Sequence, residues 1–205
     1  MGPETDEWMR LTGAPVFDWI PEPLPTVMSE HLESELQAAL SRGEDPLRIH
    51  DRLADERARQ FRDDPAFRAR VREHVEAAGV TTFGSTLISF GREDPQGWHG
   101  ILEGARRVQT YVDAADWLSK ALTPENVRAD GVSILLQIED TSALDGSIDR
   151  LAELYDFGVR TVQLTYSSRN LVGDGCAERT DAGLSDFGLE VVERANELGM
   201  MIELS

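Results

Sequence analysis

Short apolar runs recur along the chain, and amphipathic stretches separate them. Five of these runs are enriched in β-branched and aromatic residues, which is typical of β-strands. They lie at residues 16–20, 80–90, 132–138, 160–166 and 200–204. The third run, VSILLQI, is apolar at nearly every position, as in strands that are covered on both faces of a parallel sheet. The pattern therefore predicts five parallel strands.

The stretches between these runs carry apolar residues at helical spacing. We expect helices at residues 29–42, 46–61, 64–79, 101–118 and 185–199. In the fourth of these, apolar residues fall at spacings of four, three, four and three and so form one stripe: Ile101, Ala105, Val108, Val112 and Ala115. A stripe of this kind is suited to packing on a sheet.

Two of the expected helices have clear start and stop signals. Asp64 and Pro65 are typical of a helix start, and Gly79 can adopt the left-handed conformation that ends a helix. The last helix begins near Ser185, a good N-terminal cap, and ends at Gly199. These signals indicate discrete helices that alternate with the strands.

Strands that alternate with helices predict an α/β fold with a parallel sheet, either open and doubly wound or closed as a barrel. The hydrophobic pattern alone does not choose between the two. The segment after the first strand, FDWIPEPLP, lacks a Gly-rich phosphate loop, which disfavours a nucleotide-binding sheet. An eight-stranded barrel typically needs about 250 residues. Five strands in 205 residues would be about three strand-helix units short of such a barrel, and a single domain, residues 1–205, is the expected organisation.

Charge and cysteine content narrow the classes of partner. The chain has 38 Asp and Glu residues against 20 Lys and Arg residues, a formal net charge of -18, which disfavours nucleic acids and anionic membranes as partners. The single cysteine, Cys176, rules out an internal disulfide. No secretory signal opens the chain, and no run approaches the roughly 18 apolar residues that cross a bilayer. We expect a cytoplasmic protein.

Candidate chemical groups lie at the carboxyl ends of the predicted strands, where the loops of parallel α/β folds converge. Glu139 and Asp140 directly follow the third strand, and Glu203 lies in the last one. Glu139 is a candidate metal ligand, although a strand-end acid can equally cap a helix or pair with an arginine. His99 lies on the same predicted face and could touch a metal or substrate, but no local histidine motif supports it.

The loop after the fourth strand is rich in polar groups. Its residues Tyr166, Ser167, Ser168, Arg169 and Asn170 could bind a carboxylate or an amide through hydroxyl and guanidinium donors. The alternative is a polar loop of ordinary turn residues.

Longer stretches of the second half resemble the membrane (renal) dipeptidase family of zinc metallopeptidases. The stretches are GVSILLQIED, LDGSIDRLAELYDFGVRTVQLTYSSRNLVGDGC, GLSDFGLEVVERANELGM and MIELS. Residues 131–205 match densely, and residues 1–130 match in layout only. The resemblance implies a (β/α)8 barrel that hydrolyses dipeptides or related small amides with two divalent ions, expected to be zinc.

The resemblance also assigns roles to individual residues. It implies that Glu139 bridges the two metal ions, and that Glu22 could serve as an oxygen ligand. Ile20, which cannot coordinate a metal, stands where the family has a histidine ligand. Tyr166 replaces the histidine of the family's Leu-Thr-His, so the chain is similar to a divergent Leu-Thr-Tyr branch. Tyr166, with Arg169 and Asn170 in the same loop, is then expected to bind substrate.

The end of the chain affects what the resemblance implies. The family reads Asp-Leu-Ser-His at the fifth strand, whereas this sequence reads Glu203, Leu204, Ser205 and ends before that histidine. The resemblance thus implies that the chain is the front part of a longer barrel, an incomplete (β/α)8 TIM-type barrel of about five parallel strands with helices outside, and that it is inactive by itself. Two alternatives stay open. One is a non-catalytic or altered-substrate binding protein with a degenerate metal site, and the other is a half-barrel that completes itself by pairing with another chain, as in a homo-oligomer.

Overall fold

The computed structural model describes residues 17–18, 29–87, 97–127 and 131–204. The chain falls into two compact units. The first comprises Met1–Ser85 and Arg106–Ile134, and the second comprises Thr86–Ala105 and Leu135–Ser205. Glu22 and Ile20 lie outside the described residues.

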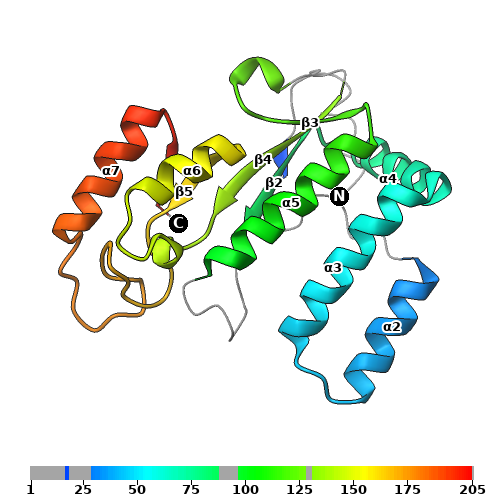
Figure 1. Ribbon diagram of the computed structural model, residues 1–205, viewed down its shortest axis with the longest axis horizontal. Helices are drawn as coiled ribbons and strands as arrows, with labels where there is room; N and C mark the ends of the chain where they lie inside the picture. Colours follow the sequence, from blue (N-terminus) through cyan, green and yellow to red (C-terminus); the bar gives the residue numbers. More distant parts are fainter. Residues whose placement is uncertain (1–16, 19–28, 88–96, 128–130, 205) are drawn as a thin grey trace, which may run out of the picture. The chain divides into compact units, whose positions relative to one another are not determined.

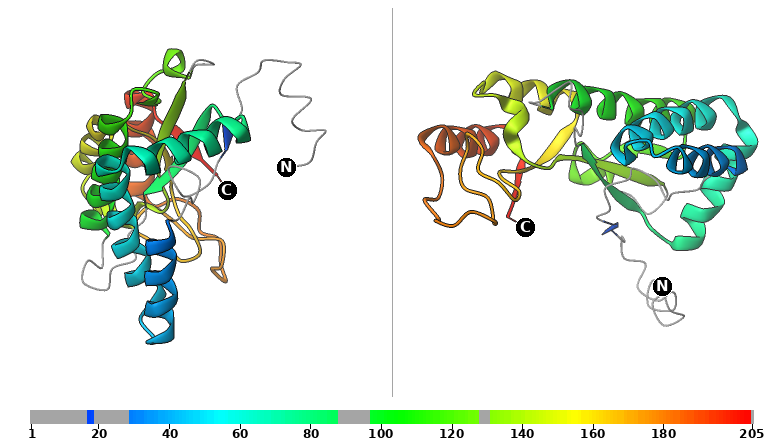
Figure 2. Two further views of the ribbon diagram at one scale, coloured as in Figure 1. Left: turned by 90° about the vertical axis from the view of Figure 1, so that its right-hand side faces the viewer. Right: turned by 90° about the horizontal axis from the view of Figure 1, so that it is seen from below.

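Helices dominate the first unit. They are α2 (Glu30–Ser41), α3 (Pro46–Asp63), α4 (Pro65–Ala78) and the second part of α5 (Trp98–Ala114). Figures 1 and 2 show α2 and α3 side by side, and their facing sides bury Leu32, Ala39, Ile49 and Leu53. This helical pair therefore has a small apolar core of its own.

The start and stop signals of α4 operate as the sequence indicates. The Asp64 side chain accepts hydrogen bonds from the backbone N–H groups of Ala66 and Phe67, at 2.9 and 3.1 Å. Gly79 closes the helix with φ 67°, in the left-handed region. These local contacts fix both ends of the helix.

The strands of the first unit pair in parallel. The short β1 (Phe17–Asp18) lies beside β2 (Thr82–Leu87), with Phe17 opposite Thr82. Another short strand, β3 (Leu118–Lys120), pairs with the beginning of β4 (Val132–Ile138), with Leu118 opposite Val132. In the whole sheet the strand order is β1-β2-β4-β5-β6, and β3 pairs with β4.

The second unit also contains parallel strands. The end of β4 pairs with β5 (Val159–Gln163), which pairs with β6 (Met201–Glu203). Helix α6 (Asp149–Phe157) connects β4 to β5, and helix α7 (Asp186–Leu198) connects β5 to β6. Figure 1 shows this alternation of strand and helix.

The sheet of the second unit has two chemically different faces, because successive side chains of a strand point to opposite sides. The register places Ile138, Val162 and Ile202 in one row across β4, β5 and β6. The neighbouring row consists of Gln137, Thr161 and Met201. We call the side that carries the second row the polar face.

Burial identifies the face that the helices cover. Ile138 and Val162 are fully buried, as are the apolar residues Leu151 and Leu154 of α6 and Val191 and Ala195 of α7. On the polar face, Gln137 and Thr161 are also buried, whereas Met201 of β6 is 51% exposed. The helices therefore pack on the apolar face and leave the polar face open along β6.

The predicted α/β fold with five parallel strands is confirmed, with shorter bounds for most of the strands. The expected helix at 101–118 ends at Ala114, because Leu118 to Lys120 form β3. The bounds of β4 agree with the expected 132–138. None of the helices that the structure describes is both long enough and apolar enough to span a bilayer.

Candidate functional site

Two carboxylates lie in one row of the polar face. Gln163 of β5 is opposite Glu203 of β6. Glu139 follows Ile138, whose partner Val162 precedes Gln163, so the register carries Glu139 into the same row. Glu139 and Glu203 thus flank Gln163 at the carboxyl ends of β4, β5 and β6, where parallel α/β folds place their functional groups.

The electrostatics of this row are unfavourable to ionised Glu139. Partial burial raises the pKa of the Glu139 carboxyl, and the negative charges of Glu203 and Asp140 raise it further. A carboxylate held among like charges is a group that a cation would stabilise. The arrangement therefore favours a positively charged ligand at the carboxyl ends of these strands.

The described residues do not complete a metal centre by themselves. Across residues 17–18, 29–87, 97–127 and 131–204, no group of three or more His, Cys, Asp or Glu side chains could hold a metal ion. Glu139 and Glu203 nevertheless offer oxygen donors, which suit hard or borderline divalent cations. Two such donors alone do not make a metal centre.

Asp140 makes a sharp turn directly after Glu139. Its backbone has φ 70° and ψ 131°, a conformation that non-glycine residues rarely adopt. Its Oδ1 atom accepts three hydrogen bonds, from the backbone N–H and the hydroxyl of Ser142 at 2.7 and 2.6 Å and from Asn170 at 2.9 Å. These donors hold the turn in place.

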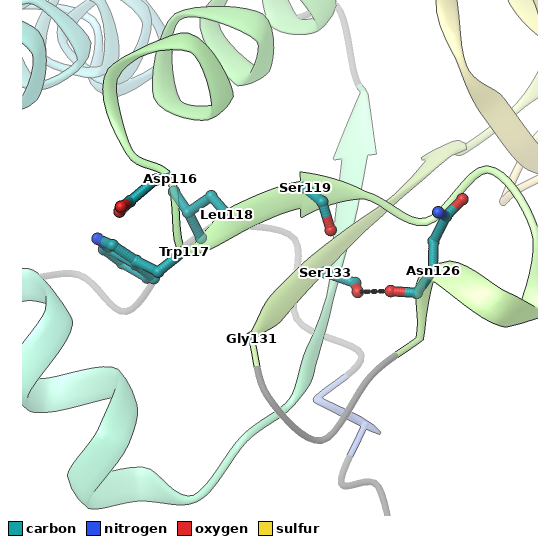
Figure 3. Close-up of a pocket in the computed structure, with 7 residues that line it drawn as sticks. All are labelled: Asp116, Trp117, Leu118, Ser119, Asn126, Gly131 and Ser133. Carbon is teal, nitrogen blue, oxygen red and sulfur yellow. Dashed lines mark hydrogen bonds between the residues drawn. The ribbon is translucent and has the colours of Figure 1, made fainter.

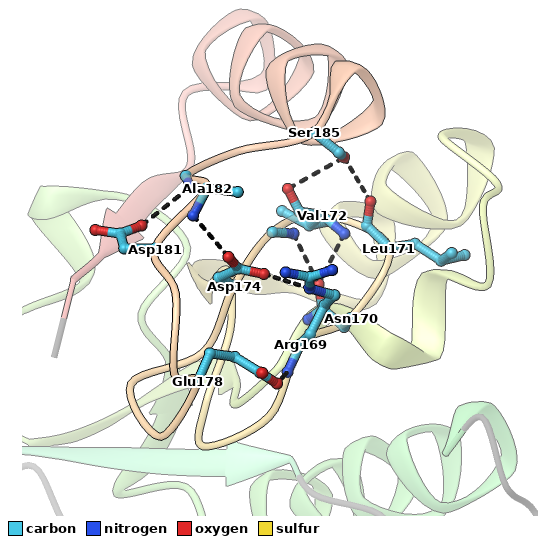
Figure 4. A network of polar contacts seen from close by, with 11 residues as sticks. Arg169, Asn170, Leu171, Val172, Asp174, Glu178, Asp181, Ala182 and Ser185 are labelled. Carbon is cyan, nitrogen blue, oxygen red and sulfur yellow. Dashed lines mark hydrogen bonds and ion pairs between the residues drawn. The ribbon is translucent and has the colours of Figure 1, made fainter.

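Asn170 links this turn to the loop between β5 and α7. Its Nδ2 group donates to Asp140 and also to the carbonyl oxygen of Leu164, at 2.9 Å in each case, and lies 3.3 Å from Thr141 Oγ1. Its Oδ1 atom accepts the backbone N–H groups of Val172 and Gly173, at 2.7 and 3.2 Å. Figure 4 shows Asn170 beside Val172 in this loop.

A second group of contacts closes the same loop. Arg169 forms an ion pair with Asp174, and its backbone N–H donates to Glu178 at 2.7 Å. Asp174 also accepts the backbone N–H of Ala182, at 2.7 Å (Figure 4). The hydrogen bond from Arg169 holds the pKa of the Asp174 carboxyl below its usual value. The Arg169 guanidinium is therefore engaged within the loop, although its side chain is 57% exposed.

Two glycines allow the backbone of the loop to pack closely. A Cβ atom at Gly175 would lie 2.6 Å from the backbone of Ser167, and one at Gly188 would lie 2.1 Å from the carbonyl oxygen of Val172. Both approaches are shorter than real side chains tolerate. The hydroxyl of Ser185, the N-terminal cap of α7, accepts the backbone N–H of Gly188 and donates to the Leu171 carbonyl. The loop is thus tied to the start of α7.

The other predicted site residues have different surroundings. Tyr166 is 54% exposed, and its carbonyl oxygen accepts the backbone N–H of Cys176, which is exposed. His99 lies in the first turn of α5, exposed, with its Nε2 3.9 Å from Glu103. The predicted ligand Glu22 lies outside the described residues.

A hollow of about 240 Å³ lies in the first unit. Figure 3 shows that its walls come from β3, from the start of β4 and from the segments beside them: Asp116, Trp117, Leu118, Ser119, Asn126, Gly131 and Ser133. The Ser133 hydroxyl donates to the Asn126 carbonyl there. This is the amino end of β4, and catalytic groups of parallel α/β folds gather at the other end, so the hollow is not the candidate site.

Sequence reasoning identified the acids at the strand ends but missed what connects them. Thr141 and Ser142 carry no catalytic signature, yet they hold the turn after Glu139. The strained conformation of Asp140 and its contact with Asn170 had no signal in the sequence.

Comparison with known proteins identifies relatives for most of this region. Residues 72–205 match the model of the family "Membrane dipeptidase (Peptidase family M19)". The chain is 27% identical to Dipeptidase 3 of Macaca fascicularis over 160 residues, which cover 75% of this chain and 32% of that protein. The aligned regions span 19% to 32% of the length of the curated relatives.

Solved structures agree with this result. An amidohydrolase from Pseudomonas aeruginosa is 28% identical, with a TM-score of 0.58 over 65% of this chain and 41% of that one. The dipeptidase AC, a metallo peptidase of family M19, superposes with a TM-score of 0.64 over 94% of this chain and 56% of its own. At 16% identity, the latter likeness concerns the fold alone.

Proposed function

The chain belongs to the membrane dipeptidase family, and from this premise we propose that it contributes to a metal-dependent dipeptidase whose substrates are dipeptides or related small amides. The observation that carries the proposal is the row formed by Glu139, Gln163 and Glu203 at the carboxyl ends of β4, β5 and β6. The raised pKa of Glu139 supports it, because like charges at one edge create a demand for a cation.

Glu139 and Glu203 are the residues that would hold a divalent metal ion, with zinc as our proposal. When bound, such an ion polarises the scissile carbonyl and lowers the pKa of the attacking water. The task of Glu139 is to offer an oxygen ligand from a strand end whose position the sheet fixes. At the first strand, this chain has Ile20 where the family resemblance implies a histidine ligand. Glu22 is therefore proposed as a further oxygen donor.

The loop after β5 would contribute to substrate binding. The phenol of Tyr166 is exposed and can donate a hydrogen bond to the carboxylate of a dipeptide. Arg169 is already paired with Asp174, so its guanidinium would contribute mainly by shaping the loop. Tyr166 is therefore the stronger candidate for direct contact.

Zinc binding by the 205-residue chain tests the metal site. Equilibrium dialysis would compare the wild type with Glu139→Gln and with a matched control, Glu153→Gln, whose side chain is exposed on α6. The control accounts for weak binding by the many surface acids. We expect Glu139→Gln to lose a tight zinc site that Glu153→Gln retains. Equal binding by all three proteins would remove the proposed role of Glu139.

A panel of dipeptides with L- or D-residues at the second position tests the activity. Release of free amino acids that requires added metal and disappears in Glu139→Gln would support the dipeptidase proposal. Because the chain alone is expected to be inactive, zinc binding without hydrolysis agrees with the dipeptidase proposal, whereas the second candidate, a binding protein with an altered metal site, predicts at most one tightly bound ion. The absence of a three-ligand group among the described residues is the observation that favours this alternative.

A further inference from the structure

We propose that Asn170 is a positioning residue, which fixes the Glu139 carboxylate by fastening the turn that follows it. The proposal gives Asn170 this role in place of the substrate contact that the family resemblance implies. It rests on the proposed function for the task of Glu139. We call the contact between the two side chains the Asp140–Asn170 clamp.

The first argument is the conformation of the turn. Asp140 has φ 70° without being glycine, in the part of conformational space where a Cβ atom is strained. Such a conformation persists only where surrounding contacts determine it. Since Asp140 directly follows Glu139, any relaxation of this strain would redirect the Glu139 side chain.

The second argument is the hydrogen-bonding capacity of the amide. A primary amide has two N–H donors and one oxygen acceptor with two lone pairs. The Nδ2 group of Asn170 lies within 2.9 Å of both Asp140 and the Leu164 carbonyl, and Oδ1 accepts two backbone N–H groups. The capacity of this side chain is therefore used inside the protein, which suits positioning better than substrate contact.

The third argument is the place of these contacts in the fold. The Leu164 carbonyl follows β5, whereas Asp140 and Thr141 follow β4, so one amide ties the carboxyl ends of two neighbouring strands. Thr141, which is buried, reinforces this tie through a hydrogen bond of 2.6 Å from its hydroxyl to the same Leu164 carbonyl. The strand ends are thereby held at a fixed separation around Glu139.

The surroundings of Asn170 are rigid enough to transmit this restraint. The close backbone approaches at Gly175 and Gly188 leave the base of the loop little room to shift. An antiparallel bridge between Gly173 and Leu184 closes the same base. Asn170 therefore reaches Asp140 from a fixed support.

The test uses Asn170→Ala, with Asn196→Ala as a matched control because Asn196 is exposed on α7. Hydrogen exchange would be followed in the peptides that contain residues 139–145. We expect about tenfold or greater acceleration there in Asn170→Ala, because loss of the clamp opens the turn locally. The control should leave these rates unchanged.

Zinc affinity is the second measurement, made by equilibrium dialysis on folded protein. Removal of a group that orients a metal ligand typically weakens binding by about 10- to 100-fold. We expect such a loss in Asn170→Ala. A purely structural role would lower the melting temperature but leave the zinc affinity of the folded protein unchanged, and that result would overturn the proposal.

If Asn170→Ala does not fold, Ser142→Ala takes its place, because it removes one neutral donor to Asp140 and leaves the rest of the turn. Because the acceptor is the Asp140 carboxylate, loss of this hydrogen bond corresponds to about a tenfold or greater weakening of the zinc affinity. An unchanged affinity would count against the proposal.

The two proposals fail in different ways. A wild-type chain that binds no zinc contradicts the proposed function. Hydrogen exchange is then the measurement that tests the Asp140–Asn170 clamp. Exchange in residues 139–145 that does not respond to Asn170→Ala would overturn the positioning proposal, whatever the metal data show.

Discussion

Glu139 and Glu203 occupy one row at the edge of the sheet, and the negative charge of Glu203 raises the pKa of the Glu139 carboxyl. Two acids placed in this way work against the stability of the folded chain when both are ionised. Functional sites commonly contain such locally unfavourable groups. The relationship therefore leads to a measurable effect of pH on stability.

Replacing Glu139 by Gln should stabilise the chain at pH 7 in the absence of divalent cations. The folded pKa of Glu139 is raised above its ordinary value of 4.5. The contribution of this group to the stability of the folded chain is therefore fully present below pH 4.5, and it is lost as the pH rises through the folded pKa. We expect a gain of at most about 1 kcal/mol, since solvent screens a partly exposed group.

Urea unfolding at several pH values measures this gain. The difference between Glu139→Gln and the wild type should shrink toward zero below pH 4.5, where the acid is protonated in both states. A variant that is less stable than the wild type at pH 7 would contradict the predicted sign. Glu153→Gln is the control for the loss of one negative charge.

The Arg169–Asp174 pair gives the opposite dependence on pH. Because the pKa of Asp174 is lowered from its ordinary value of 3.8, its contribution to stability is present above that value and lost as the pH falls through the folded pKa. We expect Asp174→Asn to be less stable than the wild type at pH 7, with a smaller difference at lower pH. Midpoints of urea unfolding at pH 7 and near pH 3 provide the comparison, and Asp156→Asn, an exposed acid of α6, is the control.

Gly188→Ala tests the close packing between α7 and the loop. The new Cβ atom would lie 2.1 Å from the Val172 carbonyl oxygen, so the backbone must shift. We expect a destabilisation of about 1–3 kcal/mol or more, the range for overpacked positions. Thermal unfolding followed by circular dichroism is a suitable measurement.

Gly104→Ala is the matched control for this substitution, because it also introduces a methyl group into a helix. Its nearest neighbour would be the tip of the Leu87 side chain, at 3.1 Å, which can adjust. The gain in helix propensity, about 1 kcal/mol, should offset most of the contact strain. Equal destabilisation by the two variants would mean that the Val172 contact has no special effect.

Substitution of Arg107 tests the contribution of its ion pairs to the stability of the first unit. It projects from α5 toward α3, with Nε 2.9 Å from Asp55 and a terminal nitrogen 3.4 Å from Asp51. Its side chain is only 18% exposed. We expect Arg107→Met to lower the free energy of unfolding by about 1 kcal/mol at low salt. The loss should diminish near about 1 M salt, where charges are screened within a few ångströms.

Arg59→Met is the comparison for Arg107→Met. Arg59 forms a surface pair with Glu56 at 2.7 Å, and its side chain is 56% exposed. Its substitution should change the free energy of unfolding by no more than about 0.5 kcal/mol. An effect as large as that of Arg107→Met would show that burial does not distinguish the two pairs.

The elements that the sequence predicted well carry their signals locally. Helix α4 has a capping acid, a proline and a closing glycine at its ends, and β4 has a near-continuous apolar run. Helix α6 was not assigned, because it is short and begins after Ile148, whose side chain makes no capping hydrogen bond. Strand β3 has three residues and depends on its pairing with β4, which no local pattern encodes.

The sequence likewise predicts only part of the candidate site. Glu139 could be predicted because it directly follows an apolar strand. Its place in one row with Glu203 depends on the pairing and register of β4, β5 and β6, which the hydrophobic pattern does not determine. The Asp140–Asn170 clamp joins residues thirty positions apart through a loop whose conformation the sequence did not specify.

The loop between β5 and α7 combines a fixed base with a tip at Arg179 and Thr180, where both residues are exposed. The contacts of Asn170, Asp174 and Ser185 all lie outside this tip. Changes in loop length would thus be absorbed at the tip, while insertions near Gly175 would disrupt folding. The tip is accordingly the natural attachment point for an epitope or a fluorescent dye, which could report on ligand arrival without disturbing the strand ends.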